Sequence, residues 1–169
     1  MTRRLTAAEA AAAIDSAEVL PSDRPRRSTP TSLLSGMAPD GSRTTEQIEG
    51  PTVVLFLSTT CDGCAELAGL VRSGIDGYAT VGMLRAPDAG LPDDAVTAFV
   101  AGGGRWLVGD DAFDAFDVRS GPFFCVVDAR GETVLEGIAF GSEQVAGHCA
   151  AVANGTPSPD AVRLTTDPR

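Results

Sequence analysis

The chain contains no lysine, one histidine, four cysteines and no long apolar run. All 13 basic residues are arginines, against 23 acidic residues, which gives a net charge of −10. A chain this acidic repels phosphate backbones, so we expect no nucleic-acid binding. The longest apolar stretch, residues 51–57, is far shorter than the roughly 20 residues that cross a bilayer. We therefore expect no membrane insertion by this chain.

The N-terminus also lacks the apolar core of an export signal. The chain as written is therefore expected to be cytoplasmic, or extracytoplasmic if an N-terminal anchor or signal was removed. Its 169 residues suit one domain with a hydrophobic core. We divide it into an N-terminal helix with a Pro/Arg-rich arm (1–30), a folded domain (31–153) and a mobile C-terminal tail (154–169), and we expect a monomer.

Apolar patterns predict alternating strands and helices after residue 31. Residues 52–57 form a continuous β-branched and aromatic run, which is typical of a central strand buried on both faces. Residues 122–128 and 132–138 flank a turn and predict an antiparallel hairpin. Further strands are expected at 32–36, 79–85 and 106–108, and helices from Cys61 to about 71, and at 92–101, 111–116 and 142–152. This order indicates an α/β domain with a mostly parallel sheet, one antiparallel edge and helices on both faces.

Four cysteines are too few for a disulfide scaffold. Cys61 and Cys64 alone have a spacing, Cys-x-x-Cys, that is typical of a reactive pair. At the start of a helix, unpaired N–H groups and the helix dipole stabilise a thiolate, which is the form that attacks disulfides. Cys64 is close enough to resolve a mixed disulfide by attacking Cys61. The pair therefore predicts thiol–disulfide exchange without a cofactor, with Cys61 as nucleophile and Cys64 as resolving cysteine.

The remaining sulfur and imidazole groups allow a second interpretation. A Cys-x-x-Cys pair can be half of a zinc site, and Cys125, His148 and Cys149 would be its only further ligands of this kind. Cys125 lies within an apolar strand pattern, however, so we expect no metal. Cys125 and Cys149 are expected to be small buried side chains, and His148 is expected on a helix surface.

A Gly-Pro motif lies just before the hairpin, at residues 118–122. Together with the strand, the Cys-x-x-Cys motif and the hairpin, it resembles the thioredoxin superfamily, in the redoxin branch of TlpA-, ResA- and MauD-like proteins. The resemblance covers about residues 33–152, and Phe56-Leu57-Ser58-x-x-Cys61-x-x-Cys64-x-x-Leu67 is most similar to MauD-like proteins. It implies a thioredoxin fold, with a central mixed β-sheet flanked by helices on both faces, an N-terminal extension and an inserted helix at 92–101.

The resemblance also implies a site for a bound polypeptide. Pro122 would be the cis-proline that packs against the cysteine pair, although base rates for X-Pro bonds favour trans. The backbone of Gly121 would pair with a client as an added strand. Thr60, Asp62 and Gly63 would complete the contact with the substrate. The partners implied are a client protein with disulfides or thiols and an unidentified redox partner.

Several positions depart from the pattern of that family. Thr60 replaces the tryptophan that usually precedes the first cysteine, which makes the site more open and polar. Leu55 and Leu67 stand where related proteins carry an acid, and Glu66 is expected to face solvent. Asp62 adds negative charge beside the thiolate, which should raise the pKa of Cys61. We therefore expect a reductant or moderate exchanger rather than a strong oxidase.

Two further functions remain open at this stage. Ser58-x-x-Cys61 is faintly similar to the peroxidatic motif of peroxiredoxins, although Val54 stands where those proteins carry a proline. The chain would alternatively be a non-catalytic thioredoxin-fold module for binding or metal delivery.

Overall fold

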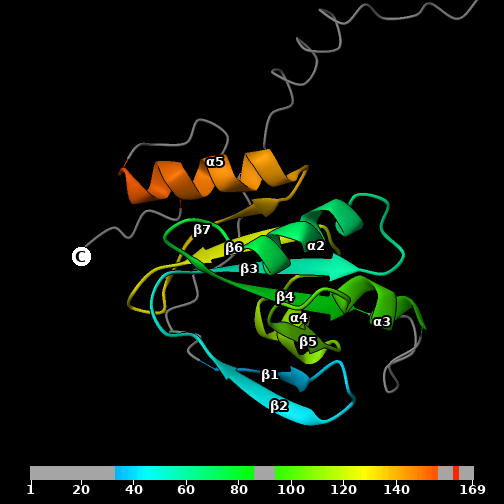
Figure 1. Cartoon of the computed structure of the whole chain (residues 1–169). Coiled ribbons are helices and arrows are strands. Elements are labelled where there is room, and N and C mark those ends of the chain that lie inside the picture. The colour runs from blue at the N-terminus through cyan, green and yellow to red at the C-terminus, as the bar shows by residue number, and fades with distance from the viewer. Residues whose placement is uncertain (1–32, 86–93, 156–161, 164–169) are drawn as a thin grey trace, which may run out of the picture.

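The computed structural model describes residues 33–85, 94–155 and 162–163. The expected arm (1–30), the start of the expected inserted helix and most of the expected tail lie outside these residues. The described strands form one sheet in the order β2-β1-β5-β4-β3-β6-β7-β8 (Figure 1). Their bounds are β1 Leu33–Met37, β2 Arg43–Gln47, β3 Thr52–Ser58, β4 Ala79–Arg85, β5 Trp106–Val108, β6 Phe123–Val127, β7 Thr133–Ile138 and β8 Val162–Arg163.

The sheet is mixed, as expected, but it is not mostly parallel. Strand β4 runs parallel to β3 and to β5, whereas the other five neighbouring pairs of the described sheet are antiparallel. The reason is that short turns close the β1–β2 and β6–β7 hairpins, and such turns can join only antiparallel strands. The connections through α2 and α3 join parallel strands, whereas the connection through α4 leads from β5 to β6, which lies antiparallel beside β3.

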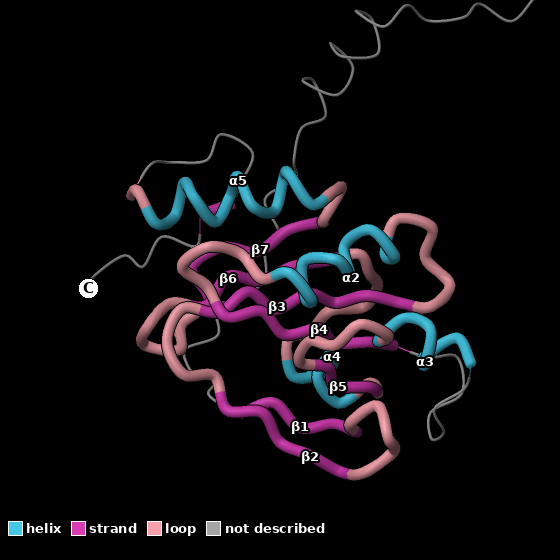
Figure 2. The backbone as a smooth tube through the Cα atoms, viewed as in Figure 1, coloured by secondary structure: helices cyan, strands magenta, loops and turns pink. Residues whose placement is uncertain are grey.

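Four helices cover the described sheet, namely α2 Cys64–Ser73, α3 Asp94–Val100, α4 Asp111–Ala115 and α5 Ser142–Ala153. Residues of α2, α3 and α5 join one hydrophobic core, and residues of α4 join the core on the opposite face. Figure 2 shows α2 and α5 lying along the same side of the sheet. Among the described residues, no helix is long and apolar enough to cross a membrane.

Strand β3 is buried on both faces, as its apolar run predicted. Val53, Leu55 and Leu57 point into the core beneath α2 and α5. Val54 and Phe56 point into the core beneath α4, where the Phe56 ring packs edge-on against Phe113. Burial of such a side chain contributes about 1.5–3 kcal/mol. The central strand therefore holds both layers of helices on one sheet.

Two features of the C-terminal region differ from expectation. His148 is buried rather than on a helix surface, with its ring stacked on Phe124 at 5.6 Å between centroids. The reason is helical spacing, because His148 lies on the same face of α5 as the buried Val145 and Cys149. The tail also contains an unexpected strand, β8, which pairs with β7. Two residues are too few for a recognisable sequence pattern.

Gly82 makes room for the single tryptophan of the chain. It pairs with Trp106 across β4 and β5, and a Cβ atom on Gly82 would overlap the indole ring. The ring cannot move aside easily, since its Nε1–H donates to the Gly103 carbonyl at 3.1 Å and Phe99 packs against it edge-on. A side chain at this position would therefore displace packed atoms.

We predict that Gly82→Ala lowers the free energy of unfolding by about 1–3 kcal/mol through overpacking. Gly69→Ala is the matched control, because a Cβ there meets nothing within 4 Å and lies within α2. Gly69→Ala should raise the free energy of unfolding by about 0.5–1 kcal/mol, because alanine is favoured over glycine within a helix. Urea denaturation of both variants measures these values. Equal stability of the two variants would contradict the packing argument.

Cys149 links the core to the pH dependence of stability. Burial raises the pKa of its thiol from 9.0 to about 12. Burial also raises the pKa of Tyr78, whose hydroxyl donates to the Cys149 carbonyl at 3.1 Å. In the unfolded chain both groups ionise at lower pH than in the folded chain. Rising pH therefore favours the unfolded state across this interval.

We predict that the free energy of unfolding falls as the pH rises from about 9 to about 12. Cys149→Ala should show a shallower fall, because it removes one of the two groups responsible. Urea denaturation at closely spaced pH values measures the slope for both proteins, with the Cys61–Cys64 disulfide kept oxidised. Identical slopes would show that the Cys149 thiol does not contribute.

Candidate functional site

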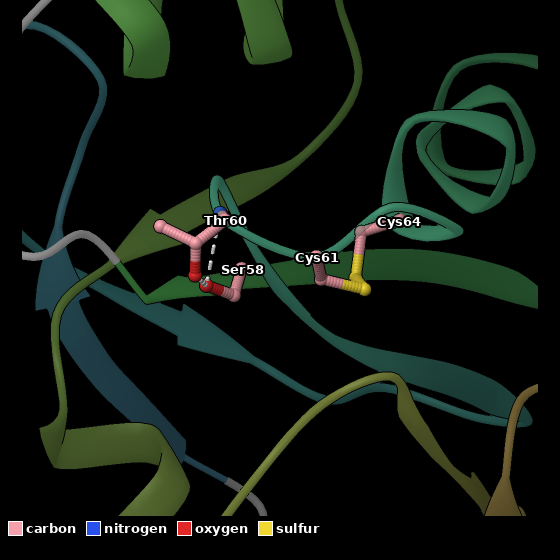
Figure 3. The surroundings of a disulfide bond; sticks show 4 residues. All are labelled: Ser58, Thr60, Cys61 and Cys64. Carbon is pink, nitrogen blue, oxygen red and sulfur yellow. Dashed lines mark hydrogen bonds between the residues drawn. A yellow bond between two sulfur atoms is a disulfide. The ribbon is translucent and has the colours of Figure 1, made fainter.

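Cys61 and Cys64 form a disulfide immediately after the central strand (Figure 3). Their Cα atoms are 5.4 Å apart. Cys61 is partly exposed, whereas Cys64 is fully buried in the core beneath α2 and α5. The two sulfurs therefore differ in access, because a molecule in solution meets Cys61 first and Cys64 lies behind it.

Helix α2 begins at Cys64 and not at Cys61, which corrects the predicted start. The chain turns at residues 62–63 first, so that the Cys64 N–H donates to the Cys61 carbonyl at 3.2 Å. The Cys61 N–H in turn donates to the Ser58 carbonyl at 3.3 Å. No side chain caps the helix at Gly63. Cys61 thus lies beyond the positive end of α2 rather than within its first turn.

Thr60, Asp62 and Gly63, the expected substrate contacts on the cysteine loop, are all exposed. The Thr60 backbone N–H donates to the Ser58 hydroxyl at 3.3 Å, and the two hydroxyl oxygens lie 3.0 Å apart (Figure 3). These contacts hold the turn that leads into Cys61. Thr60, Asp62 and Gly63 therefore form an exposed rim beside the disulfide.

The Gly-Pro motif reaches the same end of the sheet. The Gly121–Pro122 peptide bond is cis. Phe123 in β6 pairs with Phe56 in β3, so the residues before β6 lie beside those that end β3. A Cβ atom on Gly121 would approach the Phe56 carbonyl oxygen to 2.6 Å and the Leu57 Cα to 3.4 Å. The loop therefore lies directly against the end of β3, the strand that the cysteine pair follows.

Arg85 ties this loop in place, and sequence reasoning missed it. Its Nη1 donates to the Arg119 carbonyl at 2.6 Å, and its Nε donates to the Asp110 carboxylate at the same distance. The guanidinium lies 4.2 Å from the centre of the Phe113 ring. Arg85 ends β4 and pairs with Ser58. Its place at the carboxyl end of a parallel strand, where sites gather in α/β sheets, is the signal that would have found it.

Two backbone contacts connect the loop between β7 and α5 to the site. The Ala139 N–H donates to the Pro122 carbonyl at 3.1 Å. Glu66 is exposed, as expected, and its Oε1 also accepts a hydrogen bond from the Ser142 N–H at 3.2 Å. A carboxylate at a helix N-terminus is favourable, so Glu66 holds α5 against α2. No local pattern around Glu66 indicates this partner, because Ser142 lies 76 residues away in the chain.

The surroundings of Cys64 are apolar. Leu55 and Leu67 are buried in the same core as Cys64. Such surroundings disfavour a thiolate at Cys64. Cys61 is the more exposed of the two and lies beyond the end of α2.

The other two cysteines are buried, as predicted, and neither is in a disulfide. Cys125 lies in the core beneath α4, whereas Cys149 and Cys64 lie in the core on the other face. The sheet therefore separates Cys125 from the cysteine pair. Within the described residues no group of three His, Cys, Asp or Glu could hold a metal ion.

No protein-family model matches the sequence, and no curated protein matches it. Solved structures do resemble the fold. DsbF from MTB has a TM-score of 0.57 and 17% identity, with 73% of this chain and 98% of that chain covered. A secreted Mycobacterium tuberculosis disulfide oxidoreductase homologous to Escherichia coli DsbE has a TM-score of 0.56 and 18% identity, with 70% and 95% covered.

StoA from Bacillus subtilis is a third structural neighbour, with a TM-score of 0.54 and 14% identity over 72% of this chain and 98% of that chain. All three chains are thus matched over nearly their full length. The described part of the chain has a mixed sheet with helices on both faces. The chain therefore has a thioredoxin-like fold.

Proposed function

We propose that the chain is a thiol–disulfide oxidoreductase that acts on protein substrates through Cys61 and Cys64. The observation that carries this proposal is the placement of the disulfide. It joins a partly exposed sulfur to a buried one at the end of the central strand, and the cis Gly121–Pro122 loop lies against that strand. Two of the similar structures support the same activity. One is described as a secreted disulfide oxidoreductase, and the other as the thioredoxin domain of a thiol-disulfide oxidoreductase from Bacteroides vulgatus.

The reduced pair would act in two exchange steps. The Cys61 thiolate attacks one sulfur of a client disulfide, and the other client sulfur leaves as a thiolate that takes a proton from water. Cys64 then loses its proton and attacks the Cys61 sulfur, which releases the second client thiolate. One client disulfide becomes two thiols, and two electrons leave the cysteine pair, which ends as the disulfide seen here. The reverse sequence oxidises a client dithiol.

The backbone of Gly121 is the proposed contact for the client chain. Within the described part of the protein, no backbone group pairs with its N–H or C=O. An extended client segment would pair there as an added strand, beside Thr60, Asp62 and Gly63. Asp62 is exposed next to Cys61, so its charge disfavours the thiolate, and a reductant or moderate exchanger remains our proposal.

The proposed activity requires partners that carry thiols or disulfides. The proposed partners are a client protein with thiols or disulfides and a separate redox partner, and the proposed state is a monomer. One structural neighbour is described as secreted. The cytoplasm and an extracytoplasmic compartment are the two proposed locations.

We predict that Cys61→Ser abolishes reduction of insulin by the dithiothreitol-reduced protein, because the attacking sulfur is lost. Cys64→Ser should instead accumulate a mixed disulfide with the client, because the second exchange step is missing. Insulin turbidity and mass spectrometry of the intact adduct measure the two effects. Cys125→Ala is the matched control and should keep wild-type turnover. Wild-type turnover in Cys61→Ser would falsify the proposed function.

We predict that Arg85→Gln lowers kcat/KM for insulin reduction several-fold, because the Arg119 carbonyl loses its donor and the 119–122 loop is less well placed. Arg105→Gln is the control, since it removes a comparable exposed ion pair with Glu46 at the far end of the sheet. Each change should cost at most about 1 kcal/mol of stability. Equal loss of kcat/KM in both variants would remove the positioning role of Arg85.

A further inference from the structure

Two large apolar side chains are exposed where β7 ends and the loop to α5 begins, next to the Gly121–Pro122 loop. Phe140 is 82% exposed and Ile138 is 54% exposed. Among the described residues, the only other large apolar side chain in this state is Leu33, on β1. Isolated exposed apolar residues are common, but two that lie this close together mark a candidate contact surface. We call Ile138 and Phe140 the apolar pair.

The exposure of the apolar pair is built into the fold. Gln144 accepts a hydrogen bond from the Phe140 N–H at 2.7 Å and donates one to the Ile138 carbonyl at 3.2 Å. Ala139, between the two, is buried and belongs to the same core as Cys64. The loop is thus anchored through its middle residue. Both apolar side chains are therefore held in solvent.

The same loop is bonded to both halves of the proposed site. The Ala139 N–H donates to the carbonyl of Pro122, whose peptide bond with Gly121 is cis. The Ser142 N–H donates to Glu66, two residues after Cys64. Through Ala139, the apolar pair is therefore joined directly to the Gly121–Pro122 loop, on which the client segment is proposed to lie.

The exposed charges on the elements that border the proposed site are mainly negative. Exposed carboxylates lie on the cysteine loop (Asp62), on α2 (Glu66) and on the first turn of α5 (Glu143). Arg119 is the exposed basic residue on the 119–122 side. The whole chain carries a net charge of −10. A client segment with a basic residue complements this surface better than an acidic one.

We propose that the apolar pair is a client-docking surface that selects among protein substrates. Its occupant is an extended segment of a partner protein, with a large apolar side chain next to the reactive cysteine and a basic residue on the other side. Phe140 and Ile138 bury that apolar side chain, while the carboxylates on the cysteine loop, α2 and α5 attract the basic one. This inference rests on the proposed function, because the segment is selected for reaction with Cys61.

The test uses the full chain with Cys64→Ser, reduced, so that only the first exchange step occurs. The probe is a pentapeptide with one cysteine between leucine and arginine, capped by thionitrobenzoate. Cys61 attacks the cysteine sulfur of the peptide, a new disulfide forms, and thionitrobenzoate leaves as a coloured thiolate. The rate is divided by the rate with free dithiobis(nitrobenzoate), which has no peptide. This ratio reports peptide recognition apart from thiol reactivity.

We expect Phe140→Ser to lower this ratio about tenfold, because partial burial of a phenylalanine is worth about the 1.4 kcal/mol that corresponds to tenfold. Ile138→Ser should lower it by a smaller factor. Leu33→Ser is the matched control and should leave the ratio unchanged, since Leu33 is 59% exposed on β1 and four strands separate β1 from β7. An unchanged ratio in Phe140→Ser, or an equal loss in Leu33→Ser, overturns the docking surface.

The charge preference is tested with a second peptide in which glutamate replaces arginine. The arginine peptide should react faster, and the difference should shrink in 0.5 M NaCl, because salt screens exposed charges. Equal rates for both peptides at low salt would remove the charge part of the proposal. If Cys61 releases no thionitrobenzoate from either peptide or from the free reagent, the proposed function itself fails, which is a different outcome from equal ratios.

Discussion

The burial of β3 on both faces is the constraint on which the rest of the molecule depends. Its side chains alternate between two hydrophobic cores, and its backbone is paired with β4 on one side and β6 on the other. A strand held in this way cannot shift its register without exposing apolar side chains to water. Its carboxyl end is therefore a fixed point, and both loops of the candidate site are attached there.

Attachment to that fixed point is mostly through main-chain groups. The Pro122 and Arg119 carbonyls accept hydrogen bonds from Ala139 and Arg85, and Thr59 donates to the Arg85 carbonyl at 3.4 Å. Such contacts place the backbone regardless of the side chains on the loops. A change of side chain at an exposed rim residue such as Thr60 would therefore leave the relative placement of the disulfide and the Gly-Pro loop unchanged.

Much of the fold followed from local patterns in the sequence. The apolar run of β3 and the hairpin pattern of β6 and β7 are each formed by residues that are close together in the chain. These strands were therefore predictable from the sequence. The antiparallel docking of β1 on β5 and the contact of Glu66 with Ser142 join residues far apart in the chain, and no local pattern encodes them. The burial of His148 was readable from its spacing to Val145, but a single histidine on a helix usually faces water.

The depth of each sulfur divides the four cysteines into separate chemical roles. Cys61 is within reach of other molecules, Cys64 is within reach of Cys61, and Cys125 and Cys149 are enclosed on opposite faces of the sheet. In the folded chain, Cys64 is therefore the cysteine of the same protein with which Cys61 can exchange. Wrong pairings within the protein are thereby avoided without removing the two silent thiols, and they become accessible only if the core opens.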